Sequence, residues 1–102
     1  MNPANMMAQV KKMQAEMLRV QEELATTRVT GSASGGLVRV EMTCDHRVVG
    51  VKIDPKAIDP DDMETLEDLL VVAINDALAN VAQESQKRMS AVTGGMRLPG
   101  LM

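Results

Sequence analysis

Between residues 5 and 27 the apolar side chains recur at alternating intervals of four and three positions. They are Met6, Val10, Met13, Met17, Val20 and Leu24. No Gly or Pro interrupts the stretch, and strong helix formers fill it. The spacing predicts a helix over 5–27 with a coiled-coil-like seam, starting at Asn2 or Asn5 as N-cap. The alternative is a plain amphipathic helix that lies on its own sheet.

The core of this chain must be built without Phe, Tyr or Trp, since none occurs among its 102 residues. A single domain of this length buries a small fraction of its surface, and aromatic side chains normally supply much of that area. Val, Leu, Ile, Ala and ten Met have to form the core instead. Association with a second copy is the usual remedy for a thin core. We therefore expect a homodimer, with the six seam residues of helix 5–27 as its dimerisation surface.

After the first helix the apolar period changes from that of a helix to that of strands. Residues 27–31, 37–43 and 48–53 are rich in β-branched side chains, and the last two stretches alternate apolar with polar positions. Residues 31–36 are rich in Gly and Ser and read as a loop, and residues 44–47 have the length of a hairpin connection. We expect a three-stranded antiparallel meander.

A second helix is predicted over 60–93. Asp59 is a favourable N-cap, Pro60 suits the first helical position, and Gly94-Gly95 suits the end. The first half of this helix has a broad apolar face that can cover the sheet, and the half around 83–88 is polar nearly all round. The fold class is therefore α+β, in the order α-β-β-β-α. Residues 1–93 form one domain with two helical arms, and residues 94–102 form a flexible tail.

The sequence holds little that could support catalysis. Cys44 and His46 are the only Cys and the only His, and they flank Asp45 in a predicted turn without a third group to orient a base. The acids near Asp59 fit a helix N-terminus better than a calcium loop. We expect no enzyme, metal, cofactor or small-molecule substrate. One Cys and the lack of a long apolar run predict a reduced, cytoplasmic protein without a membrane segment.

Surface charge is unevenly distributed along the chain. Residues 54–76 carry eight acids and one base, although the whole chain has a net charge of only −3. Basic residues lie on the two predicted arms, away from the seam on the first helix and in the polar half of the second: Lys11, Lys12, Arg19, Lys87 and Arg88. They are either a solvated face or a phosphate contact. Without Phe, Tyr or Trp the chain has no such ring on which bases could stack, so we expect its nucleic-acid partner to be a duplex held by its phosphates.

Several short motifs resemble one known family. They are Val29-Thr30-Gly31, residues 35–40 (Gly-Gly-Leu-Val-Arg-Val), residues 51–55 (Val-Lys-Ile-Asp-Pro), residues 66–70 with 73–77, and residues 93–96 (Thr-Gly-Gly-Met). Together they cover nearly the whole chain and resemble the YbaB/EbfC family of bacterial nucleoid-associated proteins.

That resemblance implies a homodimer with a shared sheet and tweezer-like helices that bind double-stranded DNA in the nucleoid, with effects on nucleoid organisation and gene expression. Carried over, it places DNA contacts at the five bases on the arms. The alternative is a coiled-coil adaptor or scaffold whose seam binds another protein.

Overall fold

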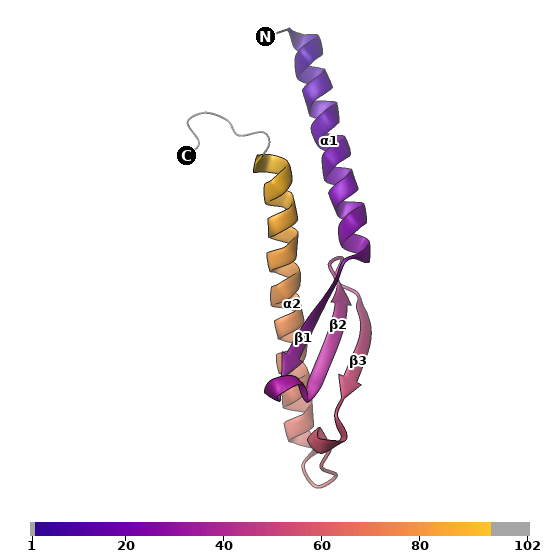
Figure 1. Cartoon of the computed structure of the whole chain (residues 1–102), viewed down its shortest axis with the longest axis vertical. Coiled ribbons are helices and arrows are strands. Elements are labelled where there is room, and N and C mark those ends of the chain that lie inside the picture. Colours follow the sequence, from indigo (N-terminus) through magenta and orange to yellow (C-terminus); the bar gives the residue numbers. More distant parts are fainter. Residues whose placement is uncertain (1, 95–102) are drawn as a thin grey trace.

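The computed structural model describes residues 2–94, with side chains to residue 92. Its elements, in chain order, are α1 (Pro3–Thr26), β1 (Arg28–Ala33), the 3-10 turn η1 (Ser34–Gly36), β2 (Val38–Thr43), β3 (Val48–Ile53), the 3-10 turn η2 (Pro55–Ala57) and α2 (Met63–Gly94) (Figure 1). The predicted α+β class, the order α-β-β-β-α and the antiparallel meander are confirmed. Apart from Gly94, the predicted tail lies outside the described residues.

Helix α1 starts two residues earlier than predicted. The Asn2 side chain accepts a hydrogen bond from the Ala4 amide at 3.1 Å and so satisfies a free donor of the first turn. Pro3 follows at the first helical position, where it needs no hydrogen-bond partner. The helix ends at Thr26, and the Thr27 amide donates to the Glu23 carbonyl at 2.9 Å.

Strand β1 spans 28–33 and not the predicted 27–31, so half of the predicted loop is strand. Gly31 lies opposite Val40, and Ala33 lies opposite Val38 in the antiparallel register. At Gly31 a Cβ atom would overlap the Ala73 carbonyl oxygen and the Ala77 backbone of α2. Gly31 is therefore present because α2 lies against the strand at this point, and the composition alone suggested a loop.

The start of α2 also differs from the prediction. The Asp59 carboxylate accepts from the Asp61 amide at 3.0 Å and closes a turn, so residues 59–61 precede the helix. Asp62 performs the capping role, because its two carboxylate oxygens accept from the Thr65 amide at 3.3 Å and the Thr65 hydroxyl at 2.6 Å. The helix begins at Met63, three residues later than predicted.

Helix α2 packs across one face of the sheet, over β1 and β2. The sheet order is β1-β2-β3, and the core lies between this face and the two helices. Its largest fully buried side chains are Val38, Val40 and Val81. Strand β3 lies beyond the reach of α2, and its apolar side chains are 37–52% exposed: Val48, Val49, Val51 and Ile53. The part of the chain that the structure describes thus leaves apolar surface on β3 without cover.

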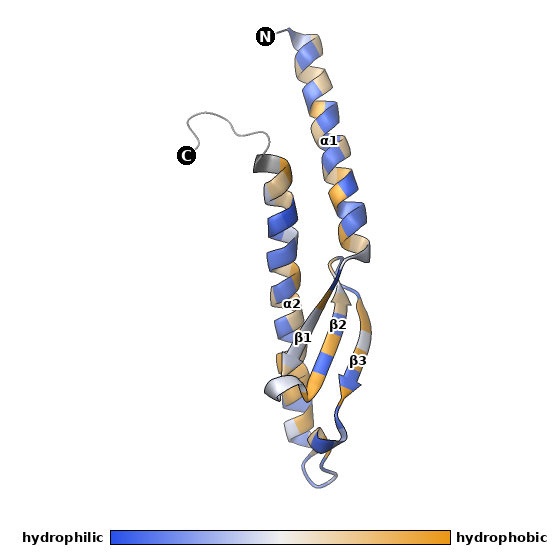
Figure 2. Cartoon of the chain, in the orientation of Figure 1, coloured by the Kyte–Doolittle hydropathy of each residue, from blue (hydrophilic) through white to orange (hydrophobic). Residues whose placement is uncertain are grey.

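Both helices extend beyond the same end of the sheet as two arms (Figure 1). The molecule measures 71 × 27 × 16 Å, and its radius of gyration is 19.7 Å. A compact domain of this length would have a radius of about 13 Å. Hydrophobic and hydrophilic residues alternate along both arms (Figure 2). Within residues 2–94 no helix is long and apolar enough to cross a membrane.

Candidate nucleic-acid interface

The five bases that the sequence singled out lie on the two arms, but they fall into two groups. Lys11 and Lys12 are exposed on the part of α1 that projects beyond the sheet, and Lys87 is exposed on α2. None of these three lysines forms an ion pair with any residue in the described part of the chain. Their ammonium groups are therefore available to an external anion.

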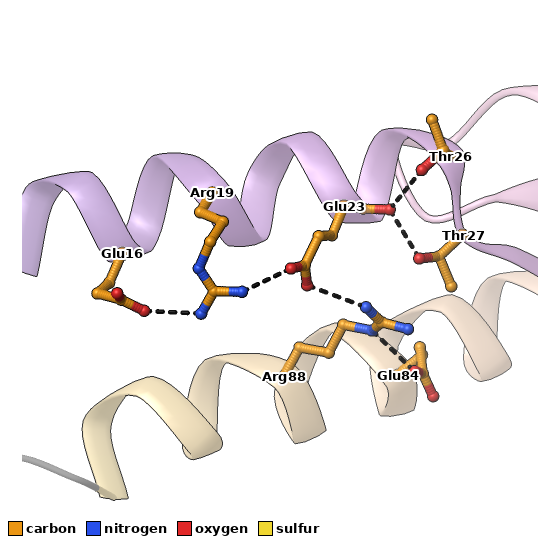
Figure 3. Close-up of polar contacts among 7 residues, drawn as sticks. All are labelled: Glu16, Arg19, Glu23, Thr26, Thr27, Glu84 and Arg88. Atoms are coloured by element: carbon orange, nitrogen blue, oxygen red, sulfur yellow. Dashed lines mark hydrogen bonds and ion pairs between the residues drawn. The ribbon is translucent and has the colours of Figure 1, made fainter.

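Arg19 and Arg88 form the second group, and they lie in a chain of ion pairs between the arms (Figure 3). Arg19 contacts Glu16 at 2.7 Å and Glu23 at 2.5 Å. Arg88 contacts Glu84 at 2.9 Å and reaches across to Glu23 at 3.2 Å. Glu23 thereby accepts from a guanidinium on each arm.

The network already supplies both guanidinium groups with carboxylate partners. The hydrogen bond from Arg19 holds the pKa of Glu16 below its ordinary value, and the same contact raises the pKa of Arg19. Three carboxylates face two guanidiniums, so the cluster as a whole has a net negative charge and does not favour phosphate. The predicted outward placement is corrected for Arg88, which is only 33% exposed and points toward α1. Arg19 is 55% exposed, and its guanidinium is held by Glu16 and Glu23. A DNA contact by Arg19 or Arg88 stays a prediction.

The seam of α1 is divided by the fold. Val20 and Leu24 are buried in the core of their own chain, where α1 meets α2 and β2. Met6 and Val10, on the projecting part, are 52% and 55% exposed. Met13 and Met17 lie between these extremes. Intrachain packing thus accounts for the last turns of the seam, and only its first half remains available to another chain.

A polar pair on α2 was not singled out from the sequence, although it shapes the surface. The Asp76 carboxylate accepts from the Ser32 amide at 2.9 Å, and the Asn80 amide donates to the Thr30 carbonyl at 2.8 Å. These two side chains bond the outer edge of β1, which would otherwise be open to another strand. The sequence held one indication of this contact: Asp76 and Asn80 are four positions apart, so they lie on the same side of the helix, next to its apolar face.

The Cys44 and His46 pair does not form a reactive site. Cys44 is buried, and that burial raises the pKa of its thiol. His46 is exposed in the β2–β3 turn with a positive φ of 68°. The two side chains therefore lie in different environments. Among the described residues no group of three or more His, Cys, Asp or Glu side chains is placed to hold a metal ion.

Comparison with known proteins adds the family to this geometry. The family model described as "YbaB/EbfC DNA-binding family" matches residues 1–96. The chain belongs to the YbaB/EbfC family. The resemblance drawn from the sequence motifs is confirmed, and the family's description names DNA binding and no enzymatic activity.

Relatives within the YbaB/EbfC family support the same assignment. The chain is 47% identical over 94 residues to a nucleoid-associated protein of Mycobacterium bovis (strain BCG / Pasteur 1173P2), covering 92% of this chain and 71% of that protein. It is 45% identical over 97 residues to a nucleoid-associated protein of Chloroflexus aurantiacus (strain ATCC 29366 / DSM 635 / J-10-fl), covering 95% and 97%.

A solved structure shares the YbaB/EbfC fold of this chain. It is the uncharacterized protein HP0035 from Helicobacter pylori, which superposes with a TM-score of 0.71 at 24% sequence identity. The match covers 88% of this chain and 94% of that one. At this identity the likeness concerns the fold alone, and it includes most of the elongated two-armed shape described above.

Proposed function

We propose that this protein binds double-stranded DNA as a homodimer in the nucleoid of the cytoplasm. Phosphates are its main contact, and its sequence specificity is low. The observation that carries the proposal is the set of three exposed arm lysines that form no ion pair with any described residue: Lys11, Lys12 and Lys87. The chain belongs to a family described as DNA-binding, and its relatives are named nucleoid-associated proteins. Both findings support duplex DNA as the anion that these lysines bind.

Low specificity follows from the kinds of side chain on the arms. Lysine ammonium groups bind phosphate as point charges and carry no information about base sequence. Without Phe, Tyr or Trp the protein lacks the ring side chains that usually form a stacking platform for unpaired bases. Its net charge of −3 opposes the approach of DNA at long range. We therefore propose binding that is strongest at low ionic strength.

The proposed dimer uses the surface of β3 that α2 leaves uncovered. Val51 and Ile53 lie opposite the buried Val40 and Val38 in the register, so the apolar core face continues onto β3 without cover. The backbone edge of β3 is open, whereas α2 side chains bond the edge of β1. A second copy that pairs along β3 would cover this apolar surface. The exposed seam residues Met6 and Val10 on the projecting part of α1 would extend the contact.

The decisive experiment is fluorescence anisotropy of a labelled duplex across a salt series, with Lys11, Lys12 and Lys87 all replaced by Gln. Each lost phosphate contact should make the slope of log K against log salt shallower by about 0.9. The control removes three other bases, in the variant Arg28→Gln, Arg47→Gln and Lys56→Gln. An arm variant that binds with the same slope as the control would contradict the role of the arms.

A protein partner is the second candidate, and the exposed apolar row on the projecting part of α1 favours it. Met6, Met7 and Val10 are 52–63% exposed there. Such a row suits a helix-in-groove contact with another protein. Recovery of one protein in stoichiometric amount on the immobilised full chain after nuclease treatment, lost in Val10→Glu, would favour this adaptor role over DNA binding.

A further inference from the structure

The face of the sheet that points away from α2 is not covered by any described part of the chain. Its side chains are those that alternate with the buried positions of β1 and β2, together with their register partners on β3. They include three bases and one acid: Arg28, Arg39, Lys52 and Glu41. We call this surface the open face. It is polar, in contrast to the apolar surface of β3 on the other side.

The charges on the open face are arranged unequally. Arg28 pairs with Glu41 at 3.2 Å, at the end of the sheet near the arms. Arg39 and Lys52 lie directly opposite each other on β2 and β3, and neither forms an ion pair with a described residue. Like charges in opposed positions of neighbouring strands destabilise a sheet. Two cations in this arrangement are therefore suited to share an anion.

The surroundings of the two cations leave room for that anion. A shallow hollow on the sheet is lined by Thr30, Arg39, Glu41, Gly50, Val51 and Lys52. A Cβ atom at Gly50 would meet nothing within 4 Å, so a ligand can approach the backbone there. The Arg39 guanidinium lies along Gly36 in η1, with Nη2 2.9 Å from where a Cβ of residue 36 would stand. A side chain at residue 36 would therefore crowd the guanidinium in this position.

Acidic residues are numerous near this end of the sheet, and three of them accept hydrogen bonds from donors close by in the sequence. Asp54 accepts from the Lys56 amide at 2.9 Å, and Asp59 accepts from the Asp61 amide at 3.0 Å. Asp62 accepts from Thr65 at the start of α2. Helix α2 packs with its apolar face on the opposite side of the sheet, and Glu64, Glu67 and Asp68 on this helix are exposed. Glu41 is the one acid on the open face, and it pairs with Arg28.

We propose that Arg39 and Lys52 form a second phosphate contact for duplex DNA, separate from the lysines on the arms. This inference rests on the proposed function and assigns it a further surface. The guanidinium can donate two hydrogen bonds to one phosphate, and the ammonium supplies the neighbouring charge. Arg39 lies at the end of β2 that follows η1. At the other end, just after β2, the Cys44 amide donates to the carbonyls of Leu24 and Thr27, where α1 begins to project. The two contacts therefore engage different phosphates.

The test compares full-length double variants by anisotropy with a labelled duplex across a salt series. Arg39→Gln with Lys52→Gln should make the salt slope shallower by about 2 for each protomer bound. The matched control, Arg28→Gln with Arg47→Gln, removes two bases whose partners are Glu41 and Asp45 and should change the slope by less than half as much. The melting temperature of the first variant should stay level or rise, because the like-charge opposition is gone.

The outcomes separate the two proposals. A slope for Arg39→Gln with Lys52→Gln equal to that of its control overturns the open-face contact, while loss of binding in the arm-lysine variant still supports the proposed function. Wild-type protein that binds no DNA at low salt overturns both. If the double variant does not fold, the single variants Arg39→Gln and Lys52→Gln are compared with Arg28→Gln, and an unchanged slope in both again overturns the contact.

Discussion

The Arg88 guanidinium on α2 lies 3.2 Å from the Glu23 carboxylate on α1, measured from Nη1 to Oε2. Glu23 also accepts from Arg19, so one carboxylate holds a cation from each arm (Figure 3). The pair lies beside Val20 and Leu24, at the level where the core joins the two helices. Glu23 therefore links the arms, and it also forms ion pairs with two of the five bases predicted to contact DNA.

Removal of this carboxylate should strengthen DNA binding. In Glu23→Gln both guanidiniums lose one partner and become more available to phosphate. We expect tighter binding and a steeper salt slope than in wild type, with a stability cost of at most about 1 kcal/mol because the pairs are exposed. The control is Glu22→Gln, which removes the same charge from an exposed neighbour. Equal gains in the two variants would mean that net charge alone governs the affinity.

Gly31 is the position where substitution should cost most stability for its size. In Gly31→Ala the new methyl group collides with the backbone of α2 at Ala73 and Ala77, so helix and strand must separate. Overpacking of this kind costs about 1–3 kcal/mol. Gly50→Ala is the matched control, because its methyl group meets nothing within 4 Å. Urea unfolding followed by circular dichroism measures both, and equal midpoints would contradict the close approach of α2.

The bond from the Ser32 amide to Asp76 should protect that amide from exchange. Asp76→Ala removes the acceptor, and we expect faster hydrogen exchange at Ser32 with a stability loss of about 1 kcal/mol. Asp76→Asn keeps an acceptor oxygen at nearly the same place and should retain most of the protection. Residue-resolved exchange by NMR reads this out directly. Exchange at Ser32 that does not differ between Asp76→Ala and wild type would exclude the bond in solution.

The proposed dimer can be tested at Val51, which is 46% exposed on β3. In Val51→Glu a charge would enter the proposed interface, and we expect the mass from sedimentation equilibrium to fall to that of one chain, 11.0 kDa. Val10→Glu places the same charge on the projecting part of α1. A monomeric Val10→Glu alongside a dimeric Val51→Glu would move the interface to the α1 seam.

Cys44 should resist alkylation in the folded protein. Burial raises the pKa of its thiol, so the reactive thiolate is scarcer than in the unfolded chain at the same pH. A thiol whose pKa is raised by folding contributes stability below its unfolded pKa, and that contribution is lost as pH rises toward the folded value. We expect slow reaction with iodoacetamide at pH 8 and fast reaction in denaturant. Comparable rates in the two conditions would show that Cys44 is accessible.

Local chemistry accounts for most of what could be read from the chain before its fold was known. The spacing of the α1 seam, its helix formers and the alternation of apolar with polar positions at 37–43 act over a few residues, and the corresponding elements are observed. The errors lie at the ends of elements. At Asp59 and Asp62 two similar capping residues stand three positions apart, and the turn closed by Asp59 decides between them.

The candidate site was predictable in composition but not in its pairing. Lys11, Lys12, Arg19, Lys87 and Arg88 follow from helical periodicity, because the period places each on a face of its own helix. Which bases are available to DNA depends on the other helix. Glu23 meets Arg88 across 65 positions of sequence, and no local pattern encodes that contact.

The sequence by itself determined the helical arms, the meander and the absence of aromatic rings, because propensity, periodicity and composition belong to the residues themselves. Only the tertiary structure decided that Glu23 forms an ion pair with Arg88, that α2 lies against Gly31, and that Arg39 lies opposite Lys52 on the open face of the sheet. These relations arise where distant segments meet. Ion pairing, steric contact and like-charge opposition depend on separations of a few ångströms, and those separations are set by packing.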